Sequence, residues 1–202
     1  MILVIANLKG GPGKTTTTAY LAAAASRRGR PVLIGDADAS SGISEWMQEW
    51  INNEWVSGVQ VAGVPSVRLL NQLVTMPLAA EEVLIIDTPP NSDHLMVEAM
   101  NHADVIVIPT RVGGGELSRV QATLSLAPPA TPRGIVICSA RSGTKDLAAT
   151  TQGWQALGES IWGVIPERVG IAAGLVAPPF GPGVDAYDIV LNKAVEMMGV
   201  KA

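Results

Sequence analysis

The chain has 202 residues, of which 48% are hydrophobic and 16% charged, and this length suits one domain, 1–202, with a substantial core. Its net charge of −4 argues against a surface coated with basic residues for nucleic acid, and at this length we expect no appended DNA-reading domain. The single cysteine, Cys138, excludes a disulfide framework, and no apolar stretch approaches the roughly 20 residues of a membrane span. We therefore expect a cytoplasmic protein that is neither exported nor embedded in a membrane.

Short apolar runs rich in Val and Ile alternate with helix-like stretches along the chain. The expected strands are 2–7, 31–38, 82–90, 103–110, 133–140 and 160–167. The expected helices are 14–28, 42–51, 65–75, 92–102, 116–127, 146–157 and 185–198. Most strands are apolar at consecutive positions, which is typical of strands covered on both faces. The alternation predicts a doubly wound α/β fold, with a mostly parallel sheet and helices on both faces.

A glycine-rich loop, KGGPGKTT, lies between the first strand and the first helix. Such a loop directs backbone N–H groups at one point, where the helix N-terminus adds its positive end, so it suits a polyphosphate. Lys14 would reach the β- and γ-phosphates, and the Thr15 hydroxyl would ligate Mg²⁺. The predicted nucleotide-binding residues are Gly10, Gly11, Pro12, Gly13, Lys14, Thr15 and Thr16. The alternative is a glycine-rich turn without a ligand.

Carboxylates end the second and third expected strands. Asp36 and Asp38 stand two residues apart near the end of the expected strand 31–38, and at least one could face the crevice at the strand ends. Asp87 follows four apolar residues, where a buried strand would fix it to hold a Mg²⁺-bound water. The alternative is that these acidic residues simply end strands at the surface, but their association with a phosphate loop favours metal chemistry.

The loop resembles a known family motif. The usual G-x4-GK[ST] spacing requires glycine at position 8, and the chain has Leu8 there. Lys9-Gly-Gly-x-Gly-Lys14-Thr15 instead resembles the deviant Walker A motif of the ParA/MinD ATPases. The segments DADAS (36–40), VLIIDTPP (83–90) and WGVIPERVGIAAGLVAPPFGPGVDAY (162–187) resemble its first switch, its Walker B strand with switch II, and its late adenine-side region. The likeness covers nearly the whole chain and fits small ParA proteins.

The resemblance implies roles for individual residues. Lys9 would cross a dimer interface to the nucleotide of the other subunit, Asp38 would orient the attacking water, and Asp36 would support the Mg²⁺ shell. On this basis the predicted catalytic residues are Lys9, Lys14 and Asp38, and the predicted metal residues are Thr15, Asp36 and Asp87; Pro166 and Glu167 would lie near the adenine. The chain departs from the family pattern at Pro12, Ala39, Ser40 and Gly170.

The resemblance also implies a function. We expect an ATPase that dimerises around two ATP·Mg²⁺ molecules, binds nonspecific DNA at the nucleoid of a bacterial or archaeal cell, and meets a ParB-like or other adaptor protein on a cargo. The segment 111–168 carries six basic and four acidic residues, so it supplies the candidate DNA contacts Arg141, Lys145 and Arg168.

Two other functions compete with this expectation. A MinD-like membrane-positioning ATPase should end in a basic amphipathic helix with bulky apolar residues, whereas DIVLNKAVEMMGVKA has two lysines and no aromatic residue. A small P-loop kinase or ligase would keep the fold without needing Lys9. We also expect Trp46 and Trp50 to share one helical face, for packing rather than for a partner.

Overall fold

The computed structural model describes residues 1–11, 13–40, 42–79, 81–90, 93–168, 171 and 177–199. In this part of the chain, seven strands form one sheet in the order β3-β2-β4-β1-β5-β6-β7, and each recorded pairing is parallel. The strands are β1 (Ile2–Ile5), β2 (Val32–Asp36), β3 (Val59–Gly63), β4 (Val83–Asp87), β5 (Val105–Arg111), β6 (Arg133–Ala140) and β7 (Ile161–Pro166). The doubly wound fold class predicted from the sequence is confirmed.

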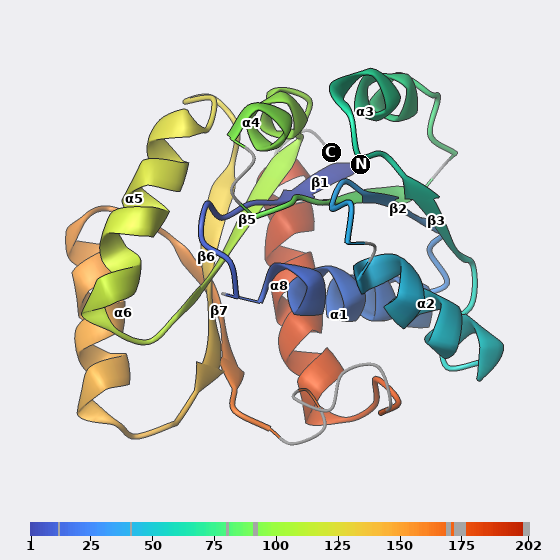
Figure 1. Ribbon diagram of the computed structural model, residues 1–202. Helices are drawn as coiled ribbons and strands as arrows, with labels where there is room; N and C mark the ends of the chain where they lie inside the picture. Colours follow the sequence, from blue (N-terminus) through green and yellow to red (C-terminus); the bar gives the residue numbers. More distant parts are fainter. Residues whose placement is uncertain are drawn as a thin grey trace.

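Helices cover both faces of the sheet (Figure 1). One face carries α1 (Lys14–Arg27), α2 (Gly42–Asn52) and α8 (Pro182–Gly199). The other carries α3 (Val67–Val74), α4 (Asp93–Asn101), α5 (Leu117–Leu126) and α6 (Lys145–Ala156), with the short 3₁₀ helix η1 (Gly114–Glu116) directly before α5. The described helices begin and end within three residues of the positions expected from the sequence.

The central strands bury side chains on both faces, as their apolar runs predicted. In β1, Leu3 and Ile5 join the core beneath α1 and α8, whereas Val4 joins the core on the opposite face, and all three are fully buried. β4 and β5 divide their side chains between the two cores in the same way. Since each of these strands contributes side chains to the cores on both faces, burial of apolar area holds the sheet between the two layers of helices.

The strand β3 was not predicted from the sequence. It pairs with β2 at one edge of the sheet, with Val59 opposite Val32 and Gly63 opposite Asp36. Only Val59 of its five residues is buried, because no further strand covers the edge and Gln60 faces solvent. An edge strand therefore lacks the continuous apolar run that identified the others.

Packing accounts for the tryptophans that the sequence offered as partner-binding candidates. Trp50 is fully buried, and the Trp46 ring meets it edge-on with ring centroids 5.7 Å apart. Trp162 lies over Gly134, where a Cβ atom would come within 2.0 Å of the indole ring, so only glycine fits beneath it. Cys138 is buried, as expected of a strand thiol. Packing is thus confirmed for these residues.

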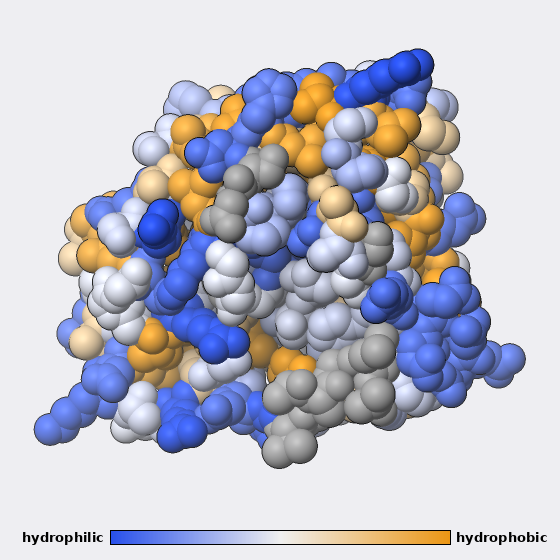
Figure 2. All heavy atoms as spheres, in the orientation of Figure 1, coloured by the Kyte–Doolittle hydropathy of each residue, from blue (hydrophilic) through white to orange (hydrophobic). Residues whose placement is uncertain are grey.

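Because the strands of the described chain are parallel, their carboxyl ends lie at one end of the sheet, where Asp36, Asp87 and Arg111 end β2, β4 and β5. Figure 2 shows that hydrophilic side chains cover much of the visible face, with apolar surface near α3 and α4. Within the described ranges, no helix combines the length and apolarity that crossing a bilayer requires.

Candidate nucleotide-binding site

The loop between β1 and α1 presents an open helix N-terminus. Gly13 takes the N-cap position with φ of 104°, a left-handed conformation that favours glycine, and no side chain caps the helix. Gly11 also has a positive φ, of 83°. The first N–H groups of α1 therefore face the loop without a side-chain acceptor, which suits an anion. Pro12 lies outside the described residues.

Lys14 begins α1 and turns back over the loop. It is 7% exposed, and its Nζ donates hydrogen bonds to the carbonyl oxygens of Asn7, at 3.1 Å, and Lys9, at 3.0 Å. Burial lowers the pKa of the ammonium, while the charges of Asp87 and Asp38 oppose that shift. An anion in the loop would replace these neutral carbonyl acceptors with charged oxygens, which attract the ammonium more strongly.

Asp87 ends β4 beside the start of α1. Its carboxylate accepts hydrogen bonds from the Thr15 hydroxyl, at 2.9 Å, and the Thr18 hydroxyl, at 3.2 Å. Asp36 lies opposite it in the pairing of β2 with β4. Burial raises the pKa of the Asp87 carboxyl to about 7, and the charge of Asp36 adds to that rise, while the two threonine hydroxyls oppose it. A bound cation would favour the charged form of Asp87.

Asp36 and Asp38 have separate surroundings. The Asp36 carboxylate is 2% exposed and accepts hydrogen bonds from the Ser44 hydroxyl, at 2.6 Å, and the Ser44 backbone N–H, at 3.3 Å. β2 ends at Asp36, so the expectation that one strand, 31–38, carries both aspartates is wrong. Asp38 follows the strand, accepts a hydrogen bond from the Ser40 N–H at 2.9 Å, and lines the cavity at the loop.

A cavity of about 260 Å³ joins these elements. Its lining is Gly10, Gly11, Gly13, Lys14, Thr15, Thr16, Asp38, Pro90 and Arg111. Arg111 was not predicted as a site residue, because an arginine at the end of a strand belongs to no recognisable motif. Its guanidinium makes no hydrogen bond or ion pair within the described residues, and Arg111 lines the cavity.

The donor set fits a nucleotide phosphate chain with Mg²⁺. Thr15 and Asp87 already touch and offer the hydroxyl and carboxylate oxygens that Mg²⁺ prefers. In the described ranges, no cluster of three or more His, Cys, Asp or Glu side chains could hold an ion by itself. This agrees with a metal held by one or two protein oxygens together with phosphates and water. Asp36 lies opposite Asp87 on the neighbouring strand β2, and its carboxylate accepts a hydrogen bond from the Ser44 hydroxyl.

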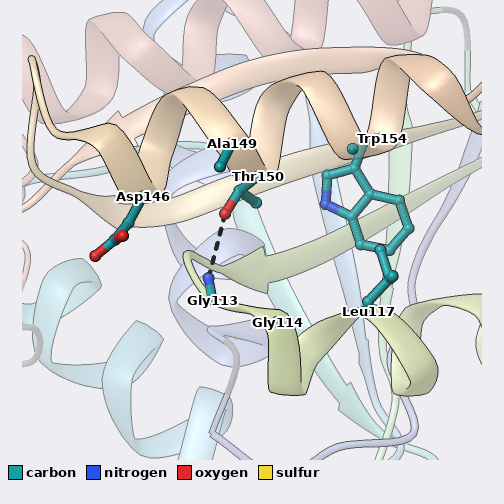
Figure 3. Close-up of a pocket in the computed structure, with 8 residues that line it drawn as sticks. Gly113, Gly114, Leu117, Asp146, Ala149, Thr150 and Trp154 are labelled. Atoms are coloured by element: carbon teal, nitrogen blue, oxygen red, sulfur yellow. Dashed lines mark hydrogen bonds between the residues drawn. The ribbon is translucent and has the colours of Figure 1, made fainter.

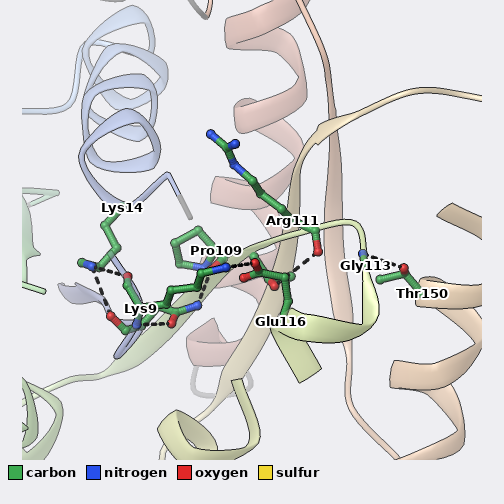
Figure 4. A network of polar contacts seen from close by, with 9 residues as sticks. Lys9, Lys14, Pro109, Arg111, Gly113, Glu116 and Thr150 are labelled. Carbon is green, nitrogen blue, oxygen red and sulfur yellow. Dashed lines mark hydrogen bonds and ion pairs between the residues drawn. The ribbon is translucent and has the colours of Figure 1, made fainter. Parts of the chain in front are cut away.

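Lys9 is engaged within its own chain (Figure 4). Its Nζ forms an ion pair with Glu116, the last residue of η1, and Figure 4 shows Arg111 extending away from that carboxylate. The Lys9 N–H donates to the Asn7 side chain at 2.8 Å, and that amide donates in turn to the Pro109 carbonyl at 2.8 Å. Asn7 and Glu116 were not predicted as site residues, because their contacts with Pro109 and Lys9 join segments far apart in the sequence.

The remaining predicted residues lie at the ends of β6 and β7. Pro166 ends β7, and the exposed Glu167 forms an ion pair with Arg141, which follows β6. This pairing lowers the pKa of Glu167 and raises that of Arg141. Lys145 and Arg168 are exposed. The three DNA candidates are therefore accessible, but Glu167 offsets the charge of one of them; Gly170 lies outside the described residues.

The fold and this site define a class of protein: a P-loop nucleotide-binding protein, whose phosphate loop joins the first strand to the first helix and faces an aspartate at the end of the adjacent strand. The family model for the CobQ/CobB/MinD/ParA nucleotide binding domain matches residues 3–175. The chain belongs to this family.

Individual relatives agree with that assignment. The chain is 34% identical to maintenance of carboxysome distribution protein A of Gloeobacter kilaueensis over 54% of its own length, and the match spans about half, 48%, of that relative. It is 29% identical to the chromosome-partitioning ATPase Soj of Thermus thermophilus, covering 92% of this chain and 91% of Soj.

Among solved structures, the septum site-determining protein MinD of Pyrococcus horikoshii, complexed with Mg-ADP, superposes with a TM-score of 0.77 at 20% identity, over 100% of this chain and 98% of MinD. At this identity the likeness establishes the fold.

Proposed function

We propose that this chain is an ATPase that hydrolyses ATP to ADP and phosphate, dimerises around two ATP·Mg²⁺ molecules, binds nonspecific DNA and positions a cargo through an adaptor protein. One observation carries the proposal: the loop that brings Lys14 to the phosphate cavity also carries a second lysine, Lys9, whose carbonyl oxygen accepts a hydrogen bond from the Lys14 ammonium. A kinase or ligase acting as a monomer has no use for that second lysine. The names of the carboxysome distribution protein and of Soj support a role in positioning.

The proposed chemistry assigns a separate task to each group. Lys14 and the N–H groups of α1 would hold the phosphates, and Thr15 and Asp87 would hold Mg²⁺, whose charge neutralises the phosphate oxygens. Asp38, at the cavity and free of the sheet, would orient the water that attacks the terminal phosphate. Phosphoryl transfer to water depends on positioning the reactants and neutralising the phosphate charge more than on a covalent intermediate with the protein. The groups named above would supply both.

Arg111 extends the proposed cation set. It lies on the cavity beside Gly13 and Lys14 but comes from β5. Lys14 and Arg111 are the two cations among the described residues that line the cavity, and Lys14 is already hydrogen-bonded to carbonyl oxygens. We assign to Arg111 a contact with a phosphate oxygen.

The test measures three activities of one preparation. ATP turnover is followed with and without Mg²⁺, particle mass is followed with a slowly hydrolysed ATP analogue, and pelleting is compared between DNA and liposomes. The proposal expects Mg²⁺-dependent turnover, a doubling of mass with the analogue, and nucleotide-dependent pelleting with DNA. Pelleting with liposomes alone would favour a MinD-like membrane protein. Turnover that requires a small-molecule acceptor, with no change in mass, would favour a metabolic P-loop enzyme.

A further inference from the structure

The ion pair between Lys9 and Glu116 sets the direction of the lysine. The Lys9 backbone N–H donates a hydrogen bond to the Asn7 side chain. The Lys9 ammonium forms an ion pair with the Glu116 carboxylate, on η1 of the same chain. The Lys9 side chain is 44% exposed and the Glu116 side chain only 10%. Solvent and a second subunit can therefore reach Lys9, whereas Glu116 depends on this contact for its charge partner.

Glu116 is poorly satisfied without Lys9. Its Oε1 accepts from Lys9, and its Oε2 is buried with no hydrogen-bond partner in the described part of the protein. The Glu116 side chain is only 10% exposed whereas the Lys9 side chain is 44% exposed, so losing this contact costs more than losing a fully exposed pair and less than losing a fully buried one. Movement of the Lys9 side chain toward a second subunit is therefore opposed by its attraction to the Glu116 carboxylate.

The segment that carries Glu116 borders a cavity on its other side (Figure 3). A space of about 240 Å³ separates Gly113, Gly114 and Leu117 from α6, where it is lined by Thr150 and Trp154 among others. One hydrogen bond, from the Gly113 N–H to the Thr150 hydroxyl at 3.3 Å, joins the two sides. A cavity leaves η1 without the close packing that would fix it, so a small displacement of Glu116 has room to occur.

We propose that Glu116 is a positioning residue that holds Lys9 in its own subunit, and that this hold must be released before Lys9 can reach the nucleotide of a second copy. The inference rests on the proposed ATP-dependent dimer. It adds an energetic cost to dimerisation, because the Lys9–Glu116 ion pair must break first. Each dimer breaks two such pairs, one in each subunit. ATP binding alone then gives a weaker dimer than the same surfaces would form with Lys9 already free.

The first test is Glu116→Gln, which keeps the size of the side chain and removes its charge. The dimer dissociation constant is measured by sedimentation equilibrium at a saturating, slowly hydrolysed ATP analogue, so that nucleotide affinity does not enter. We expect a dissociation constant about tenfold lower than in the unaltered protein, because each of the two pairs is worth roughly threefold. Glu116→Asp keeps the charge but is too short for the contact, and it should shift the constant in the same direction by less.

The chain offers a matched control. Lys193 and Glu196 form an ion pair on α8, with donor and acceptor 2.6 Å apart and both side chains at least half exposed. Glu196→Gln removes the same kind of contact away from the loop and should leave the dimer constant unchanged. An unchanged or weaker dimer in Glu116→Gln would overturn the inference, since Glu116 would then be neutral or would prepare Lys9 for crossing.

A second readout separates this inference from the proposed function. The rate of reductive methylation of each lysine is measured by mass spectrometry on nucleotide-free protein. Glu116→Gln should raise the rate at Lys9 but not at Lys193, and Glu196→Gln should do the reverse. If the unaltered protein does not dimerise with ATP, the proposed function fails, while the methylation rate still decides whether Glu116 holds Lys9; an unchanged rate at Lys9 overturns the hold.

Discussion

Two regions at the carboxyl edge of the sheet carry positive charge, and they use it differently. At the phosphate loop, Lys14 is 7% exposed, bonded to carbonyls and close to the carboxylates of Asp87 and Asp38. At the ends of β6 and β7, Arg141 is exposed and paired with Glu167. Buried charges interact strongly because little water screens them, whereas exposed pairs contribute little. If the proposed function holds, this comparison predicts strong nucleotide binding at the phosphate loop and weak, salt-sensitive DNA binding at the surface formed by the ends of β6 and β7.

Removing Lys14 should have the largest effect. Lys14→Ala is expected to lower ATP affinity about 1,000-fold, because two charge-assisted contacts to phosphate are lost and each contributes roughly 1.5–3 kcal/mol. Titration with a fluorescent ATP analogue at low protein concentration measures the change. The control is Lys145→Ala, which removes an exposed lysine from the other region. Similar affinities in the two variants would erase the contrast between the regions.

Asp38→Ala should separate binding from turnover. The phosphate loop is untouched, so ATP affinity should change less than about threefold, while turnover should fall about 100-fold because the attacking water loses its orienting carboxylate. Affinity is measured by titration and turnover by phosphate release. Asp146→Ala, on α6, is the control. Normal turnover in Asp38→Ala would exclude Asp38 and direct attention to Asp36.

The raised pKa of Asp87 predicts a pH effect limited to the metal. Burial raises this pKa from 3.8 to about 7. The protonated Asp87 carboxyl therefore adds to the free energy of unfolding of the nucleotide-free protein. This contribution is fully present below pH 3.8 and is lost as the pH rises through 7. Mg²⁺ requires the charged form, so the gain in nucleotide affinity that Mg²⁺ provides should fall by up to about tenfold for each pH unit below 7. ADP affinity with Mg²⁺ or with EDTA, compared between pH 6 and 8, measures that gain. A gain independent of pH would remove Asp87 from the metal site.

Substitutions at the surface formed by the ends of β6 and β7, which carries Arg141 and Glu167, should change affinity the least. Two subunits with about three phosphate contacts each predict a slope near −5 for the logarithm of DNA affinity against that of salt concentration. Glu167→Gln frees Arg141 and should strengthen DNA binding about threefold, and Arg141→Ala should weaken it by a similar factor. Filter binding with the ATP analogue at several salt concentrations measures both. A slope near zero would eliminate this surface as the DNA site.

Consecutive apolar positions and glycine spacing were enough to predict six of the described strands, the phosphate loop and the aspartate that touches Thr15. Those features are local in sequence, and burial on two faces leaves a strong pattern. β3 was missed because few positions of an edge strand are buried. Arg111 and Glu116 were missed because the fold brings them to the loop from far along the chain, and Asn7 was missed because its partner Pro109 is equally distant in sequence. The hydrogen bond from Asn7 to Pro109 and the ion pair from Lys9 to Glu116 span about half of the chain.

The central claim is that the two lysines of the loop serve different nucleotides, Lys14 that of its own subunit and Lys9 that of the partner. The most direct measurement is the mass of Lys9→Ala by light scattering with a slowly hydrolysed ATP analogue, at a concentration where the unaltered protein has doubled from 21.0 kDa. The account predicts that Lys9→Ala binds the analogue but keeps the mass of a monomer, because two nucleotide anions would face each other without the crossing cations. A dimer of Lys9→Ala with the analogue would contradict it.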